Sequence, residues 1–406
     1  MNKWSFHTNP YISCLSLPGQ VTRRDFLRTT ATLGGTLGTF SLFSPSFSLA
    51  GTDRVPENKN EGGIKGASEQ FVTEAKYYRK LDGLKVECEL CPKKCIVADM
   101  ERGACGVREN RGGVYYTLVM NRLCSFNIDP IEKKPLNHFL PATNVTSIAT
   151  PGCNFECRFC LNWQISQFRP EEISCHDVPP EAVVEETVAR GIPSIAYTYS
   201  EPVVFFEYMY EVAKLARARG IKNVVVSNGY IEEKPLRDLC KVVDAIKIDL
   251  KAFTDSFYTN ICAGTLKPVL RTLKIIKEEG VWNEIVVLLV TTLNDGENEI
   301  RDMCKWVVEA LGPDVPMHFS RFHKEYMLQN LPDTPIAVIE RARRIAVEEG
   351  VKFAYVGNVP GHKWESTYCP KCGKKIIGRV GFYIASRDIK NGTCAYCGES
   401  IPGVWR

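Results

Sequence analysis

A repeated alternation of short apolar runs and amphipathic helical patterns, between about residues 145 and 350, constrains the fold of this chain more than any other feature. Runs such as "VTSIAT", "NVVVSNG" and "EIVVLLV" precede patterns such as "PEAVVEETVARG" and "KPVLRTLKIIKEEG". This order is typical of parallel strands that are buried on both faces. Six such units and a last strand, "KFAYVG", are too few for a closed eight-stranded barrel. We therefore expect an α/β fold with a partial, open, TIM-like (β/α)6 barrel over residues 141–360.

Polar and ionisable residues follow nearly every predicted strand. In open α/β sheets and barrels, chemistry gathers in the loops at the carboxyl ends of the strands. We therefore expect the functional site at that edge of the barrel. The loops in chain order carry "PGCNFECRFCLNW", then Ser200 and Glu201, Asn228, Asp249 and Lys251, Thr291 and Thr292, and finally His318, Ser320, Arg321 and His323.

Most of the 17 cysteines fall into three groups of closely spaced residues. Pairs at two-residue intervals are typical of metal ligands, and a chain of 406 residues does not need a disulfide framework. We therefore expect metal sites and folding in a reducing compartment. The groups are Cys88, Cys91, Cys95 and Cys105; Cys153, Cys157 and Cys160; and Cys369, Cys372, Cys394 and Cys397.

The middle group provides three thiolates from one short loop. A four-iron cluster normally takes four thiolates, so three leave one iron open for a ligand, whereas a zinc loop is the alternative interpretation. The spacing Cys153-x3-Cys157-x2-Cys160 resembles the motif of the radical S-adenosylmethionine (SAM) superfamily. That resemblance implies a [4Fe-4S] cluster whose open iron binds SAM. It also implies an electron from a low-potential donor, which cleaves SAM to a 5′-deoxyadenosyl radical.

The same resemblance suggests cofactor contacts in the first two loops. Phe159 precedes the third cysteine, where the family often has an aromatic residue near the cluster and adenine, although a core phenylalanine is the alternative. Ser200 and Glu201 stand where related enzymes hold the methionine ammonium with a carboxylate.

Further contacts are expected after the third and fourth strands. Asn228 is a candidate for binding ribose or carboxylate, although Asn-Gly is also a common turn. The stretch "IDLK" resembles an Asp-x-Lys element of glycyl-radical activating enzymes, which implies that Asp249 and Lys251 reach the cofactor; a rim salt bridge is the alternative. No catalytic residue is assigned beyond the cluster and the SAM site, and Arg321 and His323 stay outside the catalytic set.

Cysteine-rich modules flank the predicted barrel. Over residues 361–406, "CPKCGKK" and "CAYCGES" are typical of a four-coordinate zinc ribbon, with a rubredoxin-like iron as the alternative. Over residues 76–140, the spacing of the first group suits either a structural zinc or an auxiliary iron–sulfur cluster. Cys124 is expected to be a buried thiol, although it is also a candidate replacement for one of those ligands.

The N-terminal 50 residues combine Arg23, Arg24 and a mildly apolar run that ends at Ala50, which is typical of a twin-arginine export signal. Residues 51–75 read as a polar linker. We therefore expect folding in the cytoplasm, with export to the periplasm or membrane surface as a further hypothesis. No later run reaches the length of a membrane span, and a net charge of +4 does not favour nucleic acid as a partner.

Motifs from "CELCPKKC" through "IEKKPLNHF" and "PGCNFECRFC" to "HFSRFH", over about residues 76–360, resemble the radical SAM member of the AmmeMemoRadiSam system. They are more distantly similar to pyruvate formate-lyase activating enzyme. The resemblance implies hydrogen abstraction from a protein or peptide, with Memo-like or AMMECR-type proteins as partners. The export signal and the ribbon depart from the usual form of that family. An exported iron–sulfur electron-transfer or metal-binding protein without SAM cleavage is the alternative; a nucleic-acid binder has only the ribbon in its favour.

Overall fold

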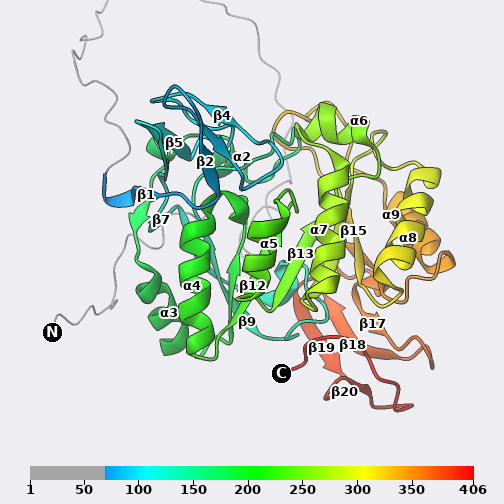
Figure 1. Cartoon of the computed structure of the whole chain (residues 1–406). Coiled ribbons are helices and arrows are strands. Elements are labelled where there is room, and N and C mark those ends of the chain that lie inside the picture. The colour runs from blue at the N-terminus through cyan, green and yellow to red at the C-terminus, as the bar shows by residue number, and fades with distance from the viewer. Residues whose placement is uncertain (1–68) are drawn as a thin grey trace, which may run out of the picture. The chain divides into compact units, whose positions relative to one another are not determined.

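The computed structural model describes residues 69–406, and these fall in one compact unit. Its centre is an eight-stranded sheet in the order β16-β15-β14-β13-β12-β11-β9-β8 (Figure 1). Seven strands run parallel, and β8 (Ser125–Pro130) pairs antiparallel with β9. The parallel strands are β9 (Asn144–Ala149), β11 (Ser194–Tyr197), β12 (Lys222–Ser227), β13 (Ala245–Asp249), β14 (Trp282–Leu289), β15 (Met317–Arg321) and β16 (Ala354–Gly357).

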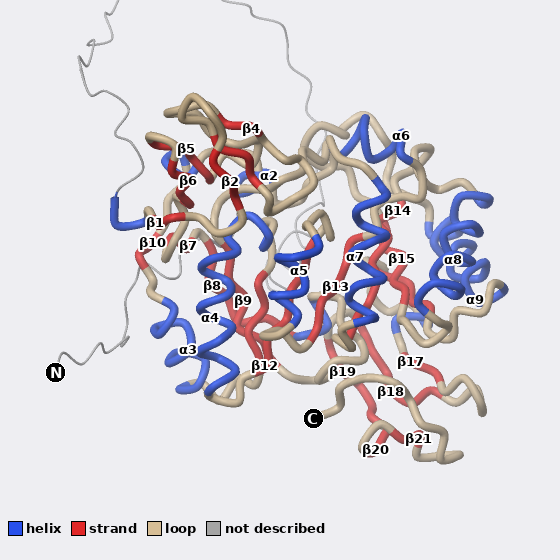
Figure 2. Tube along the Cα trace, in the orientation of Figure 1, coloured by secondary structure: helices blue, strands red, loops and turns tan. Residues whose placement is uncertain are grey.

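Six helices connect the parallel strands and cover the outer face of the sheet (Figure 2). In α7, for example, Leu266, Val269, Leu273 and Ile276 are buried on one stripe, as an amphipathic helix requires. Within the described residues no ladder joins β8 to β16, so the barrel is open. The predicted α/β fold with a partial (β/α)6 barrel is confirmed. The helices are α3 (Pro180–Ala189), α4 (Phe206–Ala218), α5 (Glu233–Cys240), α7 (Leu266–Glu278), α8 (Glu297–Leu311) and α9 (Ile336–Glu348).

The segment 131–140 fills the end of the barrel where the parallel strands begin. Its apolar side chains form a separate buried cluster with residues near the starts of four strands. The loops that carry the predicted site residues lie at the opposite end, where the parallel strands finish. The cluster consists of Ile131, Leu136, Phe139, Leu140, Val145, Ala196, Val224 and Ala245.

Small sheets lie before and after the barrel. Residues 69–75, which were expected in the linker, form η1 (Glu69–Phe71) and β1 (Thr73–Glu74), with Phe71 and Ala75 buried. The N-terminal sheets are β1-β6-β5 and β2-β3-β4, with β2 (Tyr78–Lys80), β3 (Val86–Cys88), β4 (Ile96–Val97), β5 (Arg108–Arg111) and β6 (Val114–Thr117). The C-terminal sheets are β17-β18-β19 and β20-β21, with β17 (Thr367–Tyr368), β18 (Lys375–Val380), β19 (Tyr383–Arg387), β20 (Ile389–Lys390) and β21 (Thr393–Cys394).

Short elements complete the fold, and β7 (Arg122–Leu123) pairs with β10 (His176–Asp177). Across residues 69–406, no helix has both the length and the apolar character that crossing a membrane requires. The predicted export signal lies outside the described residues and stays a prediction. The short elements are η2 (Ile131–Lys133), α2 (Trp163–Ser166), η3 (Pro170–Glu172), η4 (Pro202–Phe205), α6 (Asp255–Phe257), η5 (Tyr258–Cys262) and η6 (Lys363–Glu365).

A buried polar network joins the C-terminal residues to the barrel. Glu284, in β14, accepts a hydrogen bond from the backbone N–H of His138 at 2.8 Å. The His138 ring donates from Nδ1 to the carbonyl of Pro402 at 2.7 Å, so Nε2 is left to accept from the Tyr355 hydroxyl at 2.6 Å. Arg379, in β18, lies 6.0 Å from the Tyr355 ring. Burial favours the neutral form of His138, in which Nε2 accepts.

Acid is expected to weaken the fold through His138. Burial lowers its pKa from 6.5 to about 4, so between these values the unfolded chain binds more protons than the folded chain. The contribution of His138 to the free energy of unfolding is therefore present at pH 7. It falls by about 2 kcal/mol between pH 7 and pH 5. Urea unfolding at both pH values measures it. His138→Gln does not titrate in this range and should show a smaller loss; equal losses in both proteins would contradict the prediction.

Candidate functional site

The loop after β9 carries Cys153, Cys157 and Cys160 and is held at the carboxyl end of the parallel strands. The backbone N–H groups of Glu156 and Arg158 donate to carbonyls of η5 at 2.9 and 3.0 Å. η5 has π-helical hydrogen bonding. This kind of hydrogen bonding is rare in proteins, and where it occurs it is frequently at a functional site. The loop that sequence analysis singled out is thus fixed on both flanks of Cys157.

The spacing of the three sulfur atoms separates this group from a single-ion site. All four sulfur atoms of the C-terminal group lie within 4.8 Å of one another, and no three cysteine sulfurs elsewhere in the described chain do so. A tetrahedral zinc with Zn–S bonds of about 2.3 Å requires sulfur atoms about 3.8 Å apart. A cubane cluster binds each thiolate at a different iron and needs a wider spread. Cys153, Cys157 and Cys160 therefore fit a cluster better than one ion.

Two further side chains act on Cys157. The thiol of Cys262, which is hydrogen-bonded to Cys157, lowers the pKa of Cys157 against the effect of burial, and the charge of Lys251 adds to this. Burial raises the pKa of Cys262, which is fully buried. Sequence analysis left Cys262 among the scattered cysteines, because nothing in its local pattern places it beside the loop.

Glu201 links the loops after β11 and β12. Its carboxylate accepts from Ser227 Oγ at 2.6 Å, from the backbone N–H of Asn228 at 2.8 Å and from that of Val203 at 3.1 Å. A carboxylate offers about four acceptor positions, so these donors leave one for a ligand. Burial raises the pKa of Glu201 against these hydrogen bonds. Ser200 instead donates to the carbonyl of Thr150 at 2.6 Å, next to the cysteine loop.

Asn228 lies against the cysteine loop and also forms a turn. Its side-chain nitrogen donates to Asn154 Oδ1 at 2.8 Å and lies 4.0 Å from Cys153 Sγ. Its side-chain oxygen accepts from the backbone N–H of Tyr230 at 2.9 Å, with Gly229 at φ +73° between them. The Asn-Gly turn is therefore present, and the expected contact of Asn228 with ribose or carboxylate stays a prediction.

Asp249 stands between two lysines on the inner side of β13. Lys247 hydrogen-bonds to one of its oxygens, and Lys251 Nζ lies 3.5 Å from the other. Burial opposes ionisation, yet the two cations hold the pKa of Asp249 below its ordinary value. Lys251 also lies 5.6 Å from the Phe159 ring, which packs on Phe257. Lys247 was missed, although its alternation with 249 and 251 places all three on one face of the strand.

A second buried lysine lies near this face. Lys134 Nζ contacts Asp129 Oδ2 at 2.6 Å and stands 4.5 Å from the Tyr199 ring. Burial lowers the pKa of Lys134 to about 8, against the attraction of Asp129, and the charge of Lys247 lowers it further. The inner face of the barrel therefore carries both signs of charge close to the cysteine loop. Sequence analysis did not single out Lys134, because nothing in "IEKKPLNHF" indicates which side chains face the interior of the barrel.

The four C-terminal cysteines converge as predicted. Cys369 Sγ lies 3.6 Å from Cys397 Sγ, and Cys372 Sγ lies 3.8 Å from Cys394 Sγ. These separations match the edge of a tetrahedral site with bonds of about 2.3 Å. The group can hold one metal ion, and zinc is the ion that we propose for it.

Removing that ion is expected to loosen the C-terminal module. Folding and metal binding are coupled when only the folded chain presents all four thiolates. Cys372→Ser should lower zinc content by about one ion per chain and expose residues 361–406 to protease before the barrel. Metal analysis and limited proteolysis followed by mass spectrometry measure both effects. Unchanged zinc content in the variant would contradict the assignment.

Other predicted positions lie outside this arrangement. Cys124 is a buried thiol that donates to the carbonyl of Ala149 at 3.4 Å. Arg321 donates to the carbonyl of Thr334 at 2.7 Å, and His323 contacts Asp333 at 2.7 Å in exposed surroundings. These contacts account for all three residues without a ligand.

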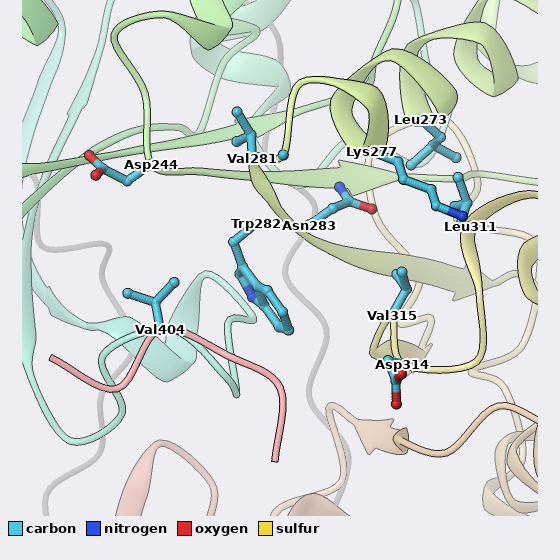
Figure 3. Close-up of a pocket in the computed structure, with 11 residues that line it drawn as sticks. Asp244, Leu273, Lys277, Val281, Trp282, Asn283, Leu311, Asp314, Val315 and Val404 are labelled. Carbon is cyan, nitrogen blue, oxygen red and sulfur yellow. The ribbon is translucent and has the colours of Figure 1, made fainter. Parts of the chain in front are cut away.

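A cavity of about 310 Å³ lies at the opposite end of the strands (Figure 3). Trp282 begins β14 and Asp244 precedes β13, so the cavity is at the end where the strands start. Val404, near the C-terminus, lines its other side. The cysteine loop and the residues around it do not contribute to it.

Comparisons with known proteins agree with this geometry. The profile described as the radical SAM superfamily matches residues 147–307. An uncharacterized protein of Methanocaldococcus jannaschii is 48% identical over 335 residues, which make up 82% of this chain and 100% of that protein. A second protein of that organism, named as a candidate glycyl-radical enzyme activating enzyme, is 25% identical over 55% of this chain and 82% of its own length.

Among solved structures, a radical SAM methyltransferase from Sphaerobacter thermophilus is 14% identical, with a TM-score of 0.44 over 54% of this chain and 67% of that one. The superfamily match covers the strands and loops from β9 to α8, including all three cysteines of the first loop. The uncharacterized relative is similar to this chain well beyond that region. Residues 147–307 of the chain form a radical SAM domain.

Proposed function

We propose that this chain cleaves SAM reductively at a [4Fe-4S] cluster held by Cys153, Cys157 and Cys160. The resulting 5′-deoxyadenosyl radical takes a hydrogen atom from a protein or peptide partner. The match of residues 147–307 to the superfamily supports the first step. The observation that carries it here is the placement of three cysteines in one loop at the same edge of the sheet as Glu201 and Lys251, with the charge of Lys251 acting on Cys157.

The cluster supplies one electron to the sulfonium of SAM and an open iron for its amino and carboxylate groups. The chain positions and shields these groups. Glu201 has one acceptor position left and pairs with the methionine ammonium. Lys251 lies near both Cys157 and Asp249, so it balances the negative charge of the thiolates. Phe159, 6% exposed, keeps water from that side of the loop.

Apolar side chains around the cysteine loop support a macromolecular substrate. Leu161 directly follows Cys160 and is 59% exposed, and Met327, whose backbone N–H donates to the carbonyl of Arg158, is 60% exposed. Nearby, Trp163 stacks on Tyr326 at 5.2 Å. Exposed apolar groups that gather at one place are typical of sites that a partner covers.

The partner class follows from resemblance. The similarity to a candidate glycyl-radical enzyme activating enzyme supports a protein substrate from which one hydrogen is abstracted. The motif likeness to the AmmeMemoRadiSam system adds Memo-like or AMMECR-type proteins as partners to test. A pyruvate formate-lyase activating activity is the specific reaction within this class that we would assay first.

The test uses the full chain, reconstituted with iron and sulfide without oxygen, then mixed with SAM and titanium(III) citrate. We expect 5′-deoxyadenosine and methionine by chromatography, and a change in the EPR signal of the reduced cluster when SAM is added. The variant Cys153→Ala/Cys157→Ala/Cys160→Ala should give neither. No product from a chain with a full complement of iron would reject the proposal and favour the electron-transfer alternative.

A further inference from the structure

Resting on the proposed function, we propose that Cys88, Cys91, Cys95 and Cys105 hold a second [4Fe-4S] cluster, which passes electrons to the cluster in the loop after β9. The two cysteine groups are far apart in sequence, and the fold brings them together. Four features of the structure carry this inference. They are the four N-terminal thiols, a buried arginine beside them, the arrangement of their sulfur atoms, and their contact with the loop that carries Cys153, Cys157 and Cys160.

Among the N-terminal cysteines, Cys88 is buried and the other three are half-buried. Cys88 is 6% exposed, and its backbone N–H donates to the carbonyl of Cys95 at 2.9 Å, which closes the first three ligands into one turn. The backbone N–H of Ala104 donates to Cys95 Sγ at 3.5 Å. Hydrogen bonds from backbone N–H groups to sulfur are among the contacts that tune iron–sulfur clusters. Gly103 lies beside Cys95, and an added Cβ there would lie 2.5 Å from the Tyr115 hydroxyl.

Arg108 is a buried cation near these cysteines, and one of its N–H groups has no hydrogen-bond acceptor among the described residues. Arg108 is 1% exposed; its Nη2 pairs with Glu207 at 2.5 Å and its Nη1 donates to the carbonyl of Lys76 at 3.3 Å. Its Nε is buried and has no acceptor among the described residues. The charge of Arg108 acts on both Cys88 and Cys105. A negatively charged metal–thiolate group held by these cysteines would compensate that buried charge.

The sulfur spacing points to a cluster instead of a single ion. No three of the four N-terminal sulfur atoms lie within 4.8 Å of one another, although all four belong to the described residues. The loop cysteines 153, 157 and 160 also do not gather in this way, whereas the C-terminal group has separations of 3.6 and 3.8 Å. Of the three groups, the C-terminal one is thus the group arranged for a single ion, and a cluster, which binds each thiolate at a different iron, is the assignment that we infer for the N-terminal group.

The segment with the N-terminal cysteines contacts the loop after β9 and its neighbour η5. Gly152, which precedes Cys153, has φ +104°, and an added Cβ would lie 3.2 Å from the carbonyl oxygen of Cys105. On the other flank, Lys93 Nζ donates to the carbonyl of Ala263 at 2.9 Å, next to Cys262. The first contact joins Cys105 itself to the residue before Cys153, and the second joins Lys93, between Cys91 and Cys95, to the residue after Cys262. The N-terminal cysteines therefore lie next to the residues that hold the loop.

The electron balance is simple. An external one-electron donor of low potential reduces the N-terminal cluster from the 2+ to the 1+ state. That cluster returns to 2+ as it reduces the loop cluster, whose electron then breaks the sulfonium C–S bond to give methionine and the 5′-deoxyadenosyl radical. Each radical consumes one electron, and no oxidant is needed.

The first experiment counts metals independently of activity. We expect about eight irons per reconstituted full chain and about four in Cys153→Ala/Cys157→Ala/Cys160→Ala, together with one zinc in each. The reduced triple variant should give a cubane EPR signal that SAM does not change. Zinc in place of iron in the N-terminal group would overturn this inference while leaving the proposed function intact, because the unaltered chain would still cleave SAM.

The second experiment tests electron transfer. In Cys91→Ala/Cys105→Ala, SAM cleavage driven by titanium(III) citrate should continue, because a small reductant reaches the loop cluster directly. Cleavage driven by reduced flavodoxin should fall to the level seen without that donor. Equal cleavage with flavodoxin in the variant and the unaltered chain would overturn the relay. Should the double variant fold poorly, Cys91→Ser/Cys105→Ser, which keeps the volume of both side chains, replaces it with the same expected and contradicting outcomes.

Discussion

Cys157→Ser is expected to reduce 5′-deoxyadenosine formation to the level without enzyme. Cys157 is the central ligand of the loop, and it is the one whose thiol Cys262 and Lys251 already favour in its charged form. A serine hydroxyl does not ionise near neutral pH and is a harder ligand than thiolate, so it does not replace sulfur on iron. Chromatography of the reaction with SAM and titanium(III) citrate, with iron analysis of the same sample, measures the effect.

The matched control is Cys304→Ser, which changes another fully buried thiol, in α8. Its iron content and its rate of 5′-deoxyadenosine formation should not change. Its free energy of unfolding should fall, because the serine hydroxyl is buried without an assigned hydrogen-bond partner. Product formation by Cys157→Ser would be informative, because Cys262 lies beside it. If Cys157→Ser/Cys262→Ser then failed, Cys262 would be the replacement ligand, and the motif alone would not define the cluster site.

The alternation of strands and helices could be predicted because it depends on burial. Strands such as β12 and β14 are covered on both faces, so they contain unbroken apolar runs, "VVV" and "IVVLL", and the helices between them show one apolar stripe. The cysteine loop could be predicted because its ligands are close in sequence. The same holds for the C-terminal group, where two short pairs supply all four sulfur atoms.

Residues that meet through tertiary packing could not be predicted in this way. Cys262 reaches Cys157 only because η5 packs on the loop, about a hundred positions earlier in the chain. Arg108 meets Glu207 from a different module, and its local sequence, "GVRENRGG", reads as an exposed turn. β8 was missed because "SFNIDP" is half polar, since one of its faces is exposed at the edge of the sheet. Lys247 is the exception, because strand alternation already aligns it with Asp249 and Lys251.

The second large effect is expected from Glu207→Gln. Glu207, in α4, pairs with Arg108, in β5, and also accepts the backbone N–H of Lys76 at 2.7 Å. Both side chains of the pair are at most 5% exposed. Removing one partner leaves an uncompensated charge in the interior, which costs about 3–5 kcal/mol of unfolding free energy. Urea unfolding of the metal-loaded chain measures the change.

Glu211→Gln provides the matched control, one turn later on the same helix. Its carboxylate lies 3.8 Å from Lys76 Nζ, with side chains 37% and 47% exposed, so its loss should cost less than about 1 kcal/mol. Equal unfolding midpoints for the two variants would mean that the buried pair contributes no more than a surface pair.

The double variant Arg108→Met/Glu207→Met distinguishes the net contribution of the ion pair to the free energy of unfolding from the cost of removing only one partner. Replacing both charges with apolar groups of similar volume leaves no charge buried, so much of the stability lost in Glu207→Gln should return. The metal content should behave differently from the stability. Arg108 is the cation beside Cys88 and Cys105, so the double variant should regain stability and still hold its N-terminal metal group less tightly. Recovery of both would mean that Arg108 serves only to join the N-terminal module to α4.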